Sequence, residues 1–204
     1  MEEDDDDDVG NKVIFLGETS VGKTNLIKVS IGKKFDPHSV TTWSASYVIR
    51  EFSYNNRNFI FDLWDNIGQE QYRSLTKIFF KEAIIVILVY DITNRRSFEE
   101  LEYWYGEVKN EVGDEFILAV VGNKSDLYTE EQVSEQEGRK YAAEKGAKFK
   151  LSSAKEDPIG FVHFLEELLK DYIDKNSNQM MGKSRGLSIK KKDMKKNNNT
   201  KKCC

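Results

Sequence analysis

The segment from Gly17 to Thr24 constrains the fold of this chain more than any other. It reads Gly-Glu-Thr-Ser-Val-Gly-Lys-Thr, which fits the phosphate-loop pattern G-x-x-x-x-G-K-S/T at every fixed position. An apolar run precedes the segment and a helix-compatible stretch follows it, which is the strand–loop–helix context that this pattern needs. The alternative, a glycine-containing turn that happens to precede a lysine, does not account for these flanks. We therefore predict a nucleoside triphosphate site.

The residues of this loop have separate expected tasks. Glycines let the backbone turn tightly, so that successive N–H groups face phosphate oxygens, and the N-terminus of the next helix adds positive potential. Lys23 is expected to reach the β- and γ-phosphates, and the hydroxyl of Thr24 is expected to bind Mg²⁺. Further phosphate contacts are expected from the loop residues Thr19, Ser20, Val21 and Gly22.

Composition divides the chain into three parts. Of its 204 residues, 39% are hydrophobic and 32% are charged, which suits one globular domain with tails. An acidic leader is expected at 1–10, a domain at 11–175 and a flexible basic tail at 176–204. The leader is negatively charged, whereas a secretory signal begins with positive charge. No apolar run approaches the roughly 20 residues of a membrane span.

The domain alternates apolar strand-like runs with amphipathic helical stretches. Strands are predicted at 13–16, 45–52, 58–64, 83–90, 116–121 and 148–151. Helices are predicted at 24–31, around 98–112, at 132–145 and from Pro158, the last with a core stripe of Ile159, Val162, Leu165, Leu168 or Leu169, and Tyr172. The short connection at 53–57 favours a hairpin and hence an antiparallel edge strand. Six strands alternating with helices, five in all including one that is not located here, indicate a doubly wound α/β sheet, whose ligand lies beyond the carboxyl ends of the strands.

Two segments at predicted strand ends indicate which base is bound. The carboxylate of Asp126, in Asn123-Lys124-Ser125-Asp126, can accept from both N1–H and the exocyclic amino group of guanine. Adenine has an acceptor at N1 and would leave a buried acid unpaired. The stem of Lys124 can cover one face of the purine, and the N–H of Ala154 can reach the guanine O6. The predicted guanine site comprises Asn123, Lys124, Asp126, Ser153, Ala154 and Lys155.

A third segment, 65–70, follows the predicted strand at 58–64. Asp65 at that strand end is expected to hold Mg²⁺ through a water molecule. Gly68 leaves its N–H free for the γ-phosphate, and Gln69 is placed to orient an attacking water. Gln69 is therefore the candidate catalytic residue.

In order along the chain, GETSVGKT, WDNIGQE, NKSD and SSAK resemble the motifs of small GTPases of the Ras superfamily, over residues 11–175. Three features resemble those of the Rab branch of this superfamily: Trp64, the aromatic Tyr47 and the terminal Cys-Cys. The resemblance implies a three-layer P-loop GTPase fold with a six-stranded, mostly parallel sheet. It also implies bound GTP or GDP with Mg²⁺, and slow hydrolysis of GTP to GDP and phosphate. In this family Thr42 corresponds to the threonine that binds Mg²⁺ through its hydroxyl and the γ-phosphate through its N–H.

The resemblance further implies a GTP/GDP switch in vesicle and membrane traffic that works through protein partners. Nucleotide exchange factors, GTPase-activating proteins and effectors are expected to bind the switch regions, which γ-phosphate contacts order. Tyr47, Trp64 and Phe79 resemble the aromatic triad with which Rab proteins present a partner surface. Ordinary core packing is the alternative for these side chains. The chain itself is expected to be a monomer.

The tail ends in Cys203 and Cys204, the only cysteines of the chain. They cannot staple a fold from there, and two ligands cannot close a zinc site. In Rab proteins such a pair carries two geranylgeranyl groups, which anchor more stably than one, and escort and extraction factors bind the lipidated tail. The resemblance thus implies the cytoplasmic face of endomembranes or vesicles, with a soluble cytosolic pool. A nucleic-acid arm is the weaker interpretation of the basic tail, because no aromatic residues interleave it.

Two departures from the family pattern bear on hydrolysis. Ile67 puts a branched side chain where the family has alanine beside the γ-phosphate and Mg²⁺, and Trp43 is a second bulky change in the segment that closes over the nucleotide. The alternative function is therefore a hydrolysis-impaired nucleotide-binding scaffold at a membrane. A further alternative, an ATP-dependent kinase or ATPase, is disfavoured by Asp126.

We predict that Ile67→Ala raises the intrinsic rate of GTP hydrolysis, because the branched side chain crowds the γ-phosphate. The natural chain is expected to turn over more slowly than the roughly 3–5 × 10⁻⁴ s⁻¹ of Ras, and the variant is expected to approach that rate. Single-turnover hydrolysis of bound GTP by the two proteins checks this, and equal rates would contradict it.

Overall fold

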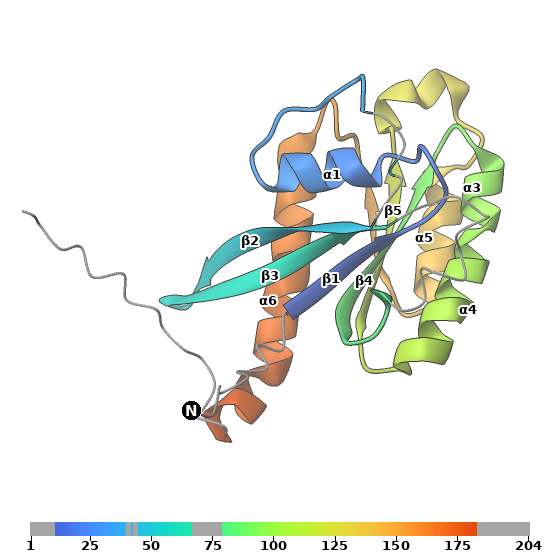
Figure 1. The fold of residues 1–204 in the computed structure, drawn as a ribbon. Coiled ribbons are helices and arrows are strands. Elements are labelled where there is room, and N and C mark those ends of the chain that lie inside the picture. The colour runs from blue at the N-terminus through green and yellow to red at the C-terminus, as the bar shows by residue number, and fades with distance from the viewer. Residues whose placement is uncertain (1–10, 40–41, 43–44, 67–78, 183–204) are drawn as a thin grey trace, which may run out of the picture.

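The computed structural model describes residues 11–39, 42, 45–66 and 79–182, which form a six-stranded sheet with helices on both faces (Figure 1). The strands are β1 (Asn11–Leu16), β2 (Ser46–Tyr54), β3 (Arg57–Asp65), β4 (Ala83–Asp91), β5 (Ile117–Asn123) and β6 (Lys148–Leu151). The α-helices are α1 (Lys23–Ser30), α3 (Arg95–Glu99), α4 (Leu101–Val112), α5 (Glu135–Glu144) and α6 (Pro158–Gly182), and η3 (Ser125–Glu130) is a 3₁₀ helix.

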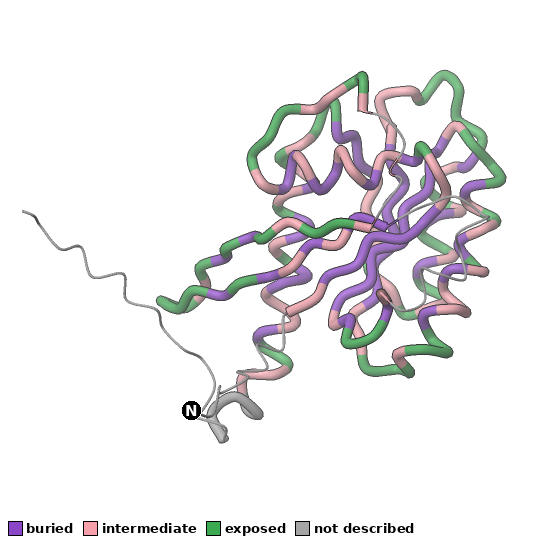
Figure 2. The backbone as a smooth tube through the Cα atoms, viewed as in Figure 1, coloured by how far each residue is buried: buried purple, intermediate pink, exposed green. Residues whose placement is uncertain are grey.

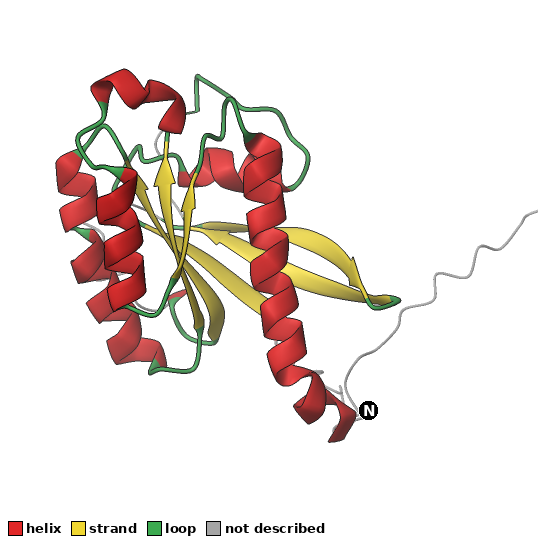
Figure 3. Ribbon diagram, turned by 180° about the vertical axis from the view of Figure 1, so that it is seen from behind, coloured by secondary structure: helices red, strands yellow, loops and turns green. Residues whose placement is uncertain are grey.

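The strands lie in the order β2-β3-β1-β4-β5-β6. β2 pairs antiparallel with β3, and every other pair is parallel. Helices α1 and α6 pack on one face of the sheet, while α3, α4 and α5 pack on the other (Figure 3). The predicted three-layer, mostly parallel sheet with one antiparallel edge strand is confirmed. Because the parallel strands share one direction, the loops that follow them gather at one edge of the sheet.

Strand β4 divides the core into two layers. Its side chains alternate: Ile85, Ile87 and Val89 face α1 and α6, whereas Val86 and Leu88 face α4 and α5. All five are fully buried, as the continuous purple trace at the centre of the sheet shows (Figure 2). A strand covered on both faces needs an unbroken apolar run, which explains why 83–90 could be recognised from composition. Burying such a side chain contributes about 1.5–3 kcal/mol.

Local chemistry explains several element ends. Asn55 and Asn56 form the two-residue turn between β2 and β3 with φ of 50° and 59°, which asparagine tolerates and which suits a tight hairpin turn. The connection is thus shorter than the predicted 53–57. Helix α5 begins at Glu135 rather than at 132, because Ser134 and Glu137 form a reciprocal capping box.

Helix α6 begins at Pro158 as predicted but differs in its buried face. The prediction that Ile159 lies in the core is wrong, because its side chain is 67% exposed. Phe161 is the buried residue in this first part of the helix. Leu165, Leu168 and Leu169 are buried as predicted. The helix continues to Gly182, beyond the predicted domain end at 175. None of the helices in the described part of the chain is long and apolar enough to cross a membrane.

A buried arginine connects the edge hairpin to the helical layer. Arg50 of β2 donates from Nη1 to the carbonyl of Ser30 at the end of α1, and from Nη2 to Oε1 of Glu166 on α6 at 2.8 Å. Burial lowers the pKa of Arg50, while Glu166 opposes that shift. One side chain therefore satisfies a helix C-terminal carbonyl and pairs with a carboxylate across three elements.

We predict that Arg50→Ala lowers the free energy of unfolding by about 2–3 kcal/mol, because charge-assisted hydrogen bonds of a buried donor are lost. Urea unfolding at a fixed nucleotide concentration measures the change. Arg139→Ala is the matched control, since its pair with Glu135 at 2.5 Å lies on the surface of α5 and is expected to leave stability nearly unchanged. Similar unfolding midpoints for both variants would contradict the prediction.

Candidate functional site

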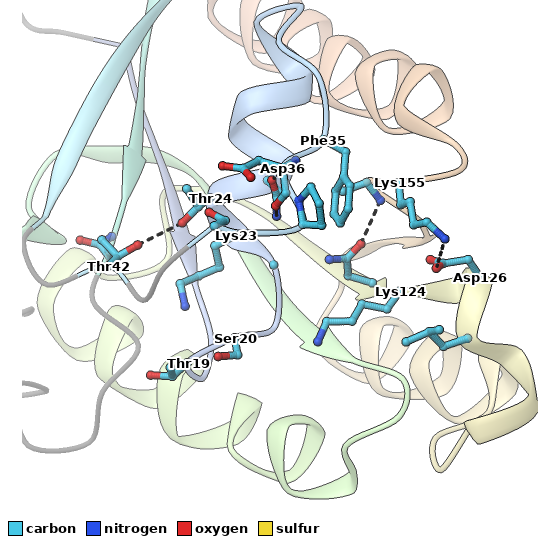
Figure 4. A pocket seen from close by; sticks show the side chains of 18 residues that line it. Thr19, Ser20, Lys23, Thr24, Phe35, Asp36, Thr42, Lys124, Asp126 and Lys155 are labelled. Atoms are coloured by element: carbon cyan, nitrogen blue, oxygen red, sulfur yellow. Dashed lines mark hydrogen bonds and ion pairs between the residues drawn. The ribbon is translucent and has the colours of Figure 1, made fainter.

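A cavity of about 440 Å³ opens at the edge of the sheet where β1, β3 and β5 end. Figure 4 shows Thr19, Ser20, Lys23, Thr24 and Thr42 toward one end of the cavity, and Phe35, Lys124, Asp126 and Lys155 toward the other. The complete lining is Thr19, Ser20, Gly22, Lys23, Thr24, Asn25, Phe35, Asp36, Pro37, Ser39, Thr42, Asn66, Asn123, Lys124, Asp126, Leu127, Ala154 and Lys155. Segments that are distant in the sequence thus line one cavity, as the phosphate-loop and base-reading motifs predict for a single nucleotide site.

The loop between β1 and α1 depends on two glycines. Gly17 and Gly22 have φ of 140° and 100°, in the region that disfavours other residues. A Cβ at Gly17 would collide with the carbonyl oxygen of Val89, and one at Gly22 would collide with Nδ2 of Asn123. Ser20 also has a positive φ, of 64°. The fixed glycines of the pattern therefore serve close backbone packing as well as the turn.

Lys23 lies buried beneath this loop. Its ammonium donates to the carbonyls of Gly17 and Glu18, both at 2.8 Å. Burial lowers the pKa of Lys23 to about 8, and Asp65 and Glu18 oppose the shift. A cation held by neutral carbonyls in a desolvated place is well prepared to receive an anion.

Three side-chain oxygens meet beside the loop. The Thr24 hydroxyl donates to Oδ2 of Asp65 at 2.6 Å, and the Thr42 hydroxyl lies 3.0 Å from that of Thr24 and 3.3 Å from the same carboxylate oxygen. Burial raises the pKa of Asp65, and the bonds from Thr24 and Thr42 partly offset it. Oδ1 of Asp65 is buried and has no hydrogen-bond partner within the described ranges. An oxygen-only cluster with a spare carboxylate oxygen fits a hard cation such as Mg²⁺.

The opposite end of the cavity is held together by side chains of the two predicted base-reading segments. Asn123 donates from Nδ2 to the carbonyl of Val21 at 2.8 Å and accepts from the N–H of Ala154 at 3.3 Å. The Ser153 hydroxyl donates to Oδ1 of Asp126 at 2.6 Å. Val21 and Ser153 make these hydrogen bonds but do not line the cavity. Asp65, at the phosphate end, does not line it either. The other predicted residues of these segments line it directly.

Several lining residues were missed by sequence reasoning. The long connection after α1 contributes Phe35, Asp36 and Pro37, and Asn25 fixes it by bonding both the carbonyl and the N–H of Asp36 at 3.1 Å. The length of that polar connection indicates a functional loop, but no sequence motif predicts which of its residues contact the cavity. Asn66 was also missed, although both polar atoms of its side chain are buried and without a hydrogen-bond partner in the described part of the chain.

Some predicted positions lie outside the described residues. They are Gly68 and Gln69, the departures Trp43 and Ile67, and the terminal Cys203 and Cys204.

A separate aromatic cluster lies on the outer face of the β2–β3 hairpin. Tyr47 stacks on Trp64 with ring centroids 5.0 Å apart, and Trp64 packs against Phe79 at 5.7 Å. Tyr47 is 52% exposed, so core packing does not explain it. Lys12 lies over the Trp64 ring at 4.6 Å. Trp64 and Phe79 are partly buried, and Trp64 also packs against the core layer that contains residues of α4 and α5, so the cluster extends from the exposed Tyr47 to that layer.

Comparison with known proteins assigns the family. The model of the Ras family matches residues 12–174. Ras-related protein Rab-21 of Homo sapiens is 36% identical over 177 residues, which cover 87% of this chain and 78% of that protein. Ras-related protein SEC4 of Saccharomyces cerevisiae is 35% identical over 177 residues, which cover 86% of this chain and 81% of that protein. These matches favour a GTPase over the hydrolysis-impaired scaffold. The chain therefore belongs to the Ras family, as a Rab-type GTPase of vesicle traffic.

Proposed function

We propose that the cavity binds GTP or GDP with Mg²⁺, with the phosphates on the Gly17–Thr24 loop and the guanine beside Asp126. The observation that carries this proposal is the meeting of the Thr24, Thr42 and Asp65 oxygens at one end of a cavity whose other end presents a second carboxylate. The phosphate contacts are assigned to Thr19, Ser20, Val21, Gly22, Lys23, Thr24, Thr42 and Gly68. The guanine contacts are assigned to Asn123, Lys124, Asp126, Ser153, Ala154 and Lys155.

The residues of the phosphate end have complementary tasks in hydrolysis. Bound Mg²⁺ supplies positive charge that offsets the developing charge on the phosphates. The hydroxyls of Thr24 and Thr42 would hold the ion directly, and Asp65 would hold it through a water. The ammonium of Lys23 would turn from the carbonyls of Gly17 and Glu18 to phosphate oxygens. Gln69 is the residue proposed to orient the attacking water.

The same contacts provide the switch. Thr42 reaches the cluster from the long connection after α1, so its position depends on what Thr24 and Asp65 bind. With GTP, the N–H groups of Thr42 and Gly68 would both contact the γ-phosphate, and hydrolysis would remove those contacts. Segments around the two residues would then be free to leave the nucleotide.

We assign the partner surface to the outer face of the β2–β3 hairpin. The cluster of Tyr47, Trp64 and Phe79 continues along this face into Ile49 and Ile60, which are 59% and 55% exposed. Contiguous exposed apolar side chains of this kind mark protein-interaction sites. Exchange factors, GTPase-activating proteins and effectors are the expected partners, and the chain is proposed to act as a monomer.

The tail is proposed to anchor the protein to the cytoplasmic face of endomembranes or vesicles. Cys203 and Cys204 would each carry a geranylgeranyl group, and the lysines that precede them would add attraction to an anionic leaflet. Escort and extraction factors that cover the lipids would maintain a soluble cytosolic pool.

Replacing Asp126 tests the assignment of the base. Asp126→Asn is expected to lower the affinity for GDP roughly 10³-fold or more, because an amide cannot accept from both N1–H and the amino group of guanine. The same variant is expected to gain affinity for xanthosine diphosphate, whose C2 carbonyl suits the new amide N–H. Equilibrium titration with fluorescent nucleotides measures both.

Asp157→Asn serves as a control, since Asp157 caps α6 through Gly160 at 2.9 Å and does not line the cavity. Unchanged guanine preference in the Asp126 variant would refute the assigned orientation of the nucleotide.

Removing the terminal thiols tests the anchor. The double variant Cys203→Ser, Cys204→Ser is expected to move from the membrane to the soluble fraction, and each single variant is expected to bind membranes weakly, since one chain gives only marginal binding. Fractionation of the native cell, together with the intact mass of the purified protein, measures location and lipidation separately. An unmodified mass for the natural chain would overturn the proposal.

A further inference from the structure

Asp91, the last residue of β4, is fixed behind the cavity. Its side chain is 8% exposed and does not line the cavity. Oδ1 accepts from the N–H of Thr93 at 2.9 Å and from its hydroxyl at 2.7 Å. The backbone N–H of Asp91 donates to the hydroxyl of Ser97 at 3.0 Å, and Asp91 pairs with Asn123 across the sheet. The carboxylate is therefore held in one orientation from several sides.

The second carboxylate oxygen points at a cavity residue. Oδ2 of Asp91 lies 2.5 Å from Nζ of Lys124, which lines the cavity. Lys124 also has φ of 65°, a left-handed conformation that is uncommon for residues with a side chain. Its carbonyl accepts from the N–H of Leu127 at 2.9 Å. The backbone and the far end of this lysine are thus both fixed, and the aliphatic stem is stretched between them.

We propose that Asp91 is a positioning residue of the guanine site, which holds the stem of Lys124 in place for the base. The inference rests on the proposed guanine site. A lysine stem has several rotatable bonds and loses conformational freedom whenever it is ordered against a ligand. The ion pair orders it before the base arrives, and such preorganisation reduces the cost of binding. Asp91 thereby slows release of the nucleotide without touching it.

The geometry also separates this role from simple support of the fold. Oδ1 and the backbone of Asp91 serve the turn at Thr93 and Ser97, whereas Oδ2 pairs with Lys124. An asparagine at position 91 keeps the shape and the Oδ1 bonds but presents an amide N–H₂ to the ammonium. Asp91→Asn therefore removes the ion pair selectively. Lys124→Met removes the same ion pair from the other side and keeps an apolar stem.

The test is a double-mutant cycle on the dissociation rate of a fluorescent GDP analogue, chased with excess GDP. Asp91→Asn and Lys124→Met are each expected to accelerate dissociation roughly five- to tenfold, the scale of losing one charge-assisted contact. The double variant is expected to match Lys124→Met alone, because residues that act through one contact are not additive. Asp171→Asn is the control, since its 2.5 Å pair with Lys148 joins α6 to β6 away from the cavity.

Each outcome has a definite meaning. Accelerated release by Asp91→Asn that disappears in the Lys124→Met background supports the proposal. Unchanged release, or acceleration that multiplies with that of Lys124→Met, overturns it. If Asp91→Asn does not fold, Asp91→Ser replaces it in the cycle, since a hydroxyl oxygen can still accept at the turn while the ion pair to Lys124 is lost, and the same non-additive effect is expected. A natural chain that binds no GDP would instead refute the proposed guanine site itself.

Discussion

The amide of Asn123 is the contact on which the whole cavity depends. It is 2% exposed, and it joins the phosphate loop through Val21 to the segment at Ala154. Its donor also occupies the space that a Cβ at Gly22 would need. One buried side chain thus connects its own loop to two others, which lie 102 and 31 residues away along the chain, and the two ends of the cavity keep a fixed spacing. A ligand with a rigid sugar between base and phosphates requires such spacing.

The sequence predicted the site best where the chemistry is local. The loop from Gly17 to Thr24 is one continuous segment, and its glycine pattern follows from backbone geometry alone. The segments that carry Asp65 and Asp126 were also found, because Asp65 ends a predicted strand and Asp126 follows shortly after another one. The contribution of Phe35 was not found, since it follows from how the long connection after α1 packs and not from any spacing. Asn66 lies directly after Asp65 in a segment that was recognised, but no motif assigned its side chain to the cavity. The prediction for Ile159 was wrong because helical periodicity identifies the apolar face of a helix but does not show whether the first turn packs against the core.

Strand β3 shows how a nucleotide site and a partner surface come to share one element. Successive residues of a strand point to opposite faces. Asp65 is buried and accepts from Thr24, while the preceding Trp64 lies on the outer face and stacks with Tyr47. A single peptide bond therefore separates a proposed metal-binding carboxylate from the centre of the aromatic cluster. Arg50 fixes the same hairpin to the end of α1, which begins at the phosphate loop.

The buried polar atoms around the phosphate loop have a consequence for the stability of the fold. Lys23 has its pKa lowered by burial, and Asp65 and Asn66 hold buried atoms that no hydrogen bond within the described part of the chain satisfies. Buried polar groups without partners lower the free energy of unfolding until a ligand forms hydrogen bonds with them. A ligand that binds only the folded chain stabilises it in proportion to the logarithm of its free concentration. The proposed guanine nucleotide would thereby also act as a folding ligand, which stabilises the chain that binds it.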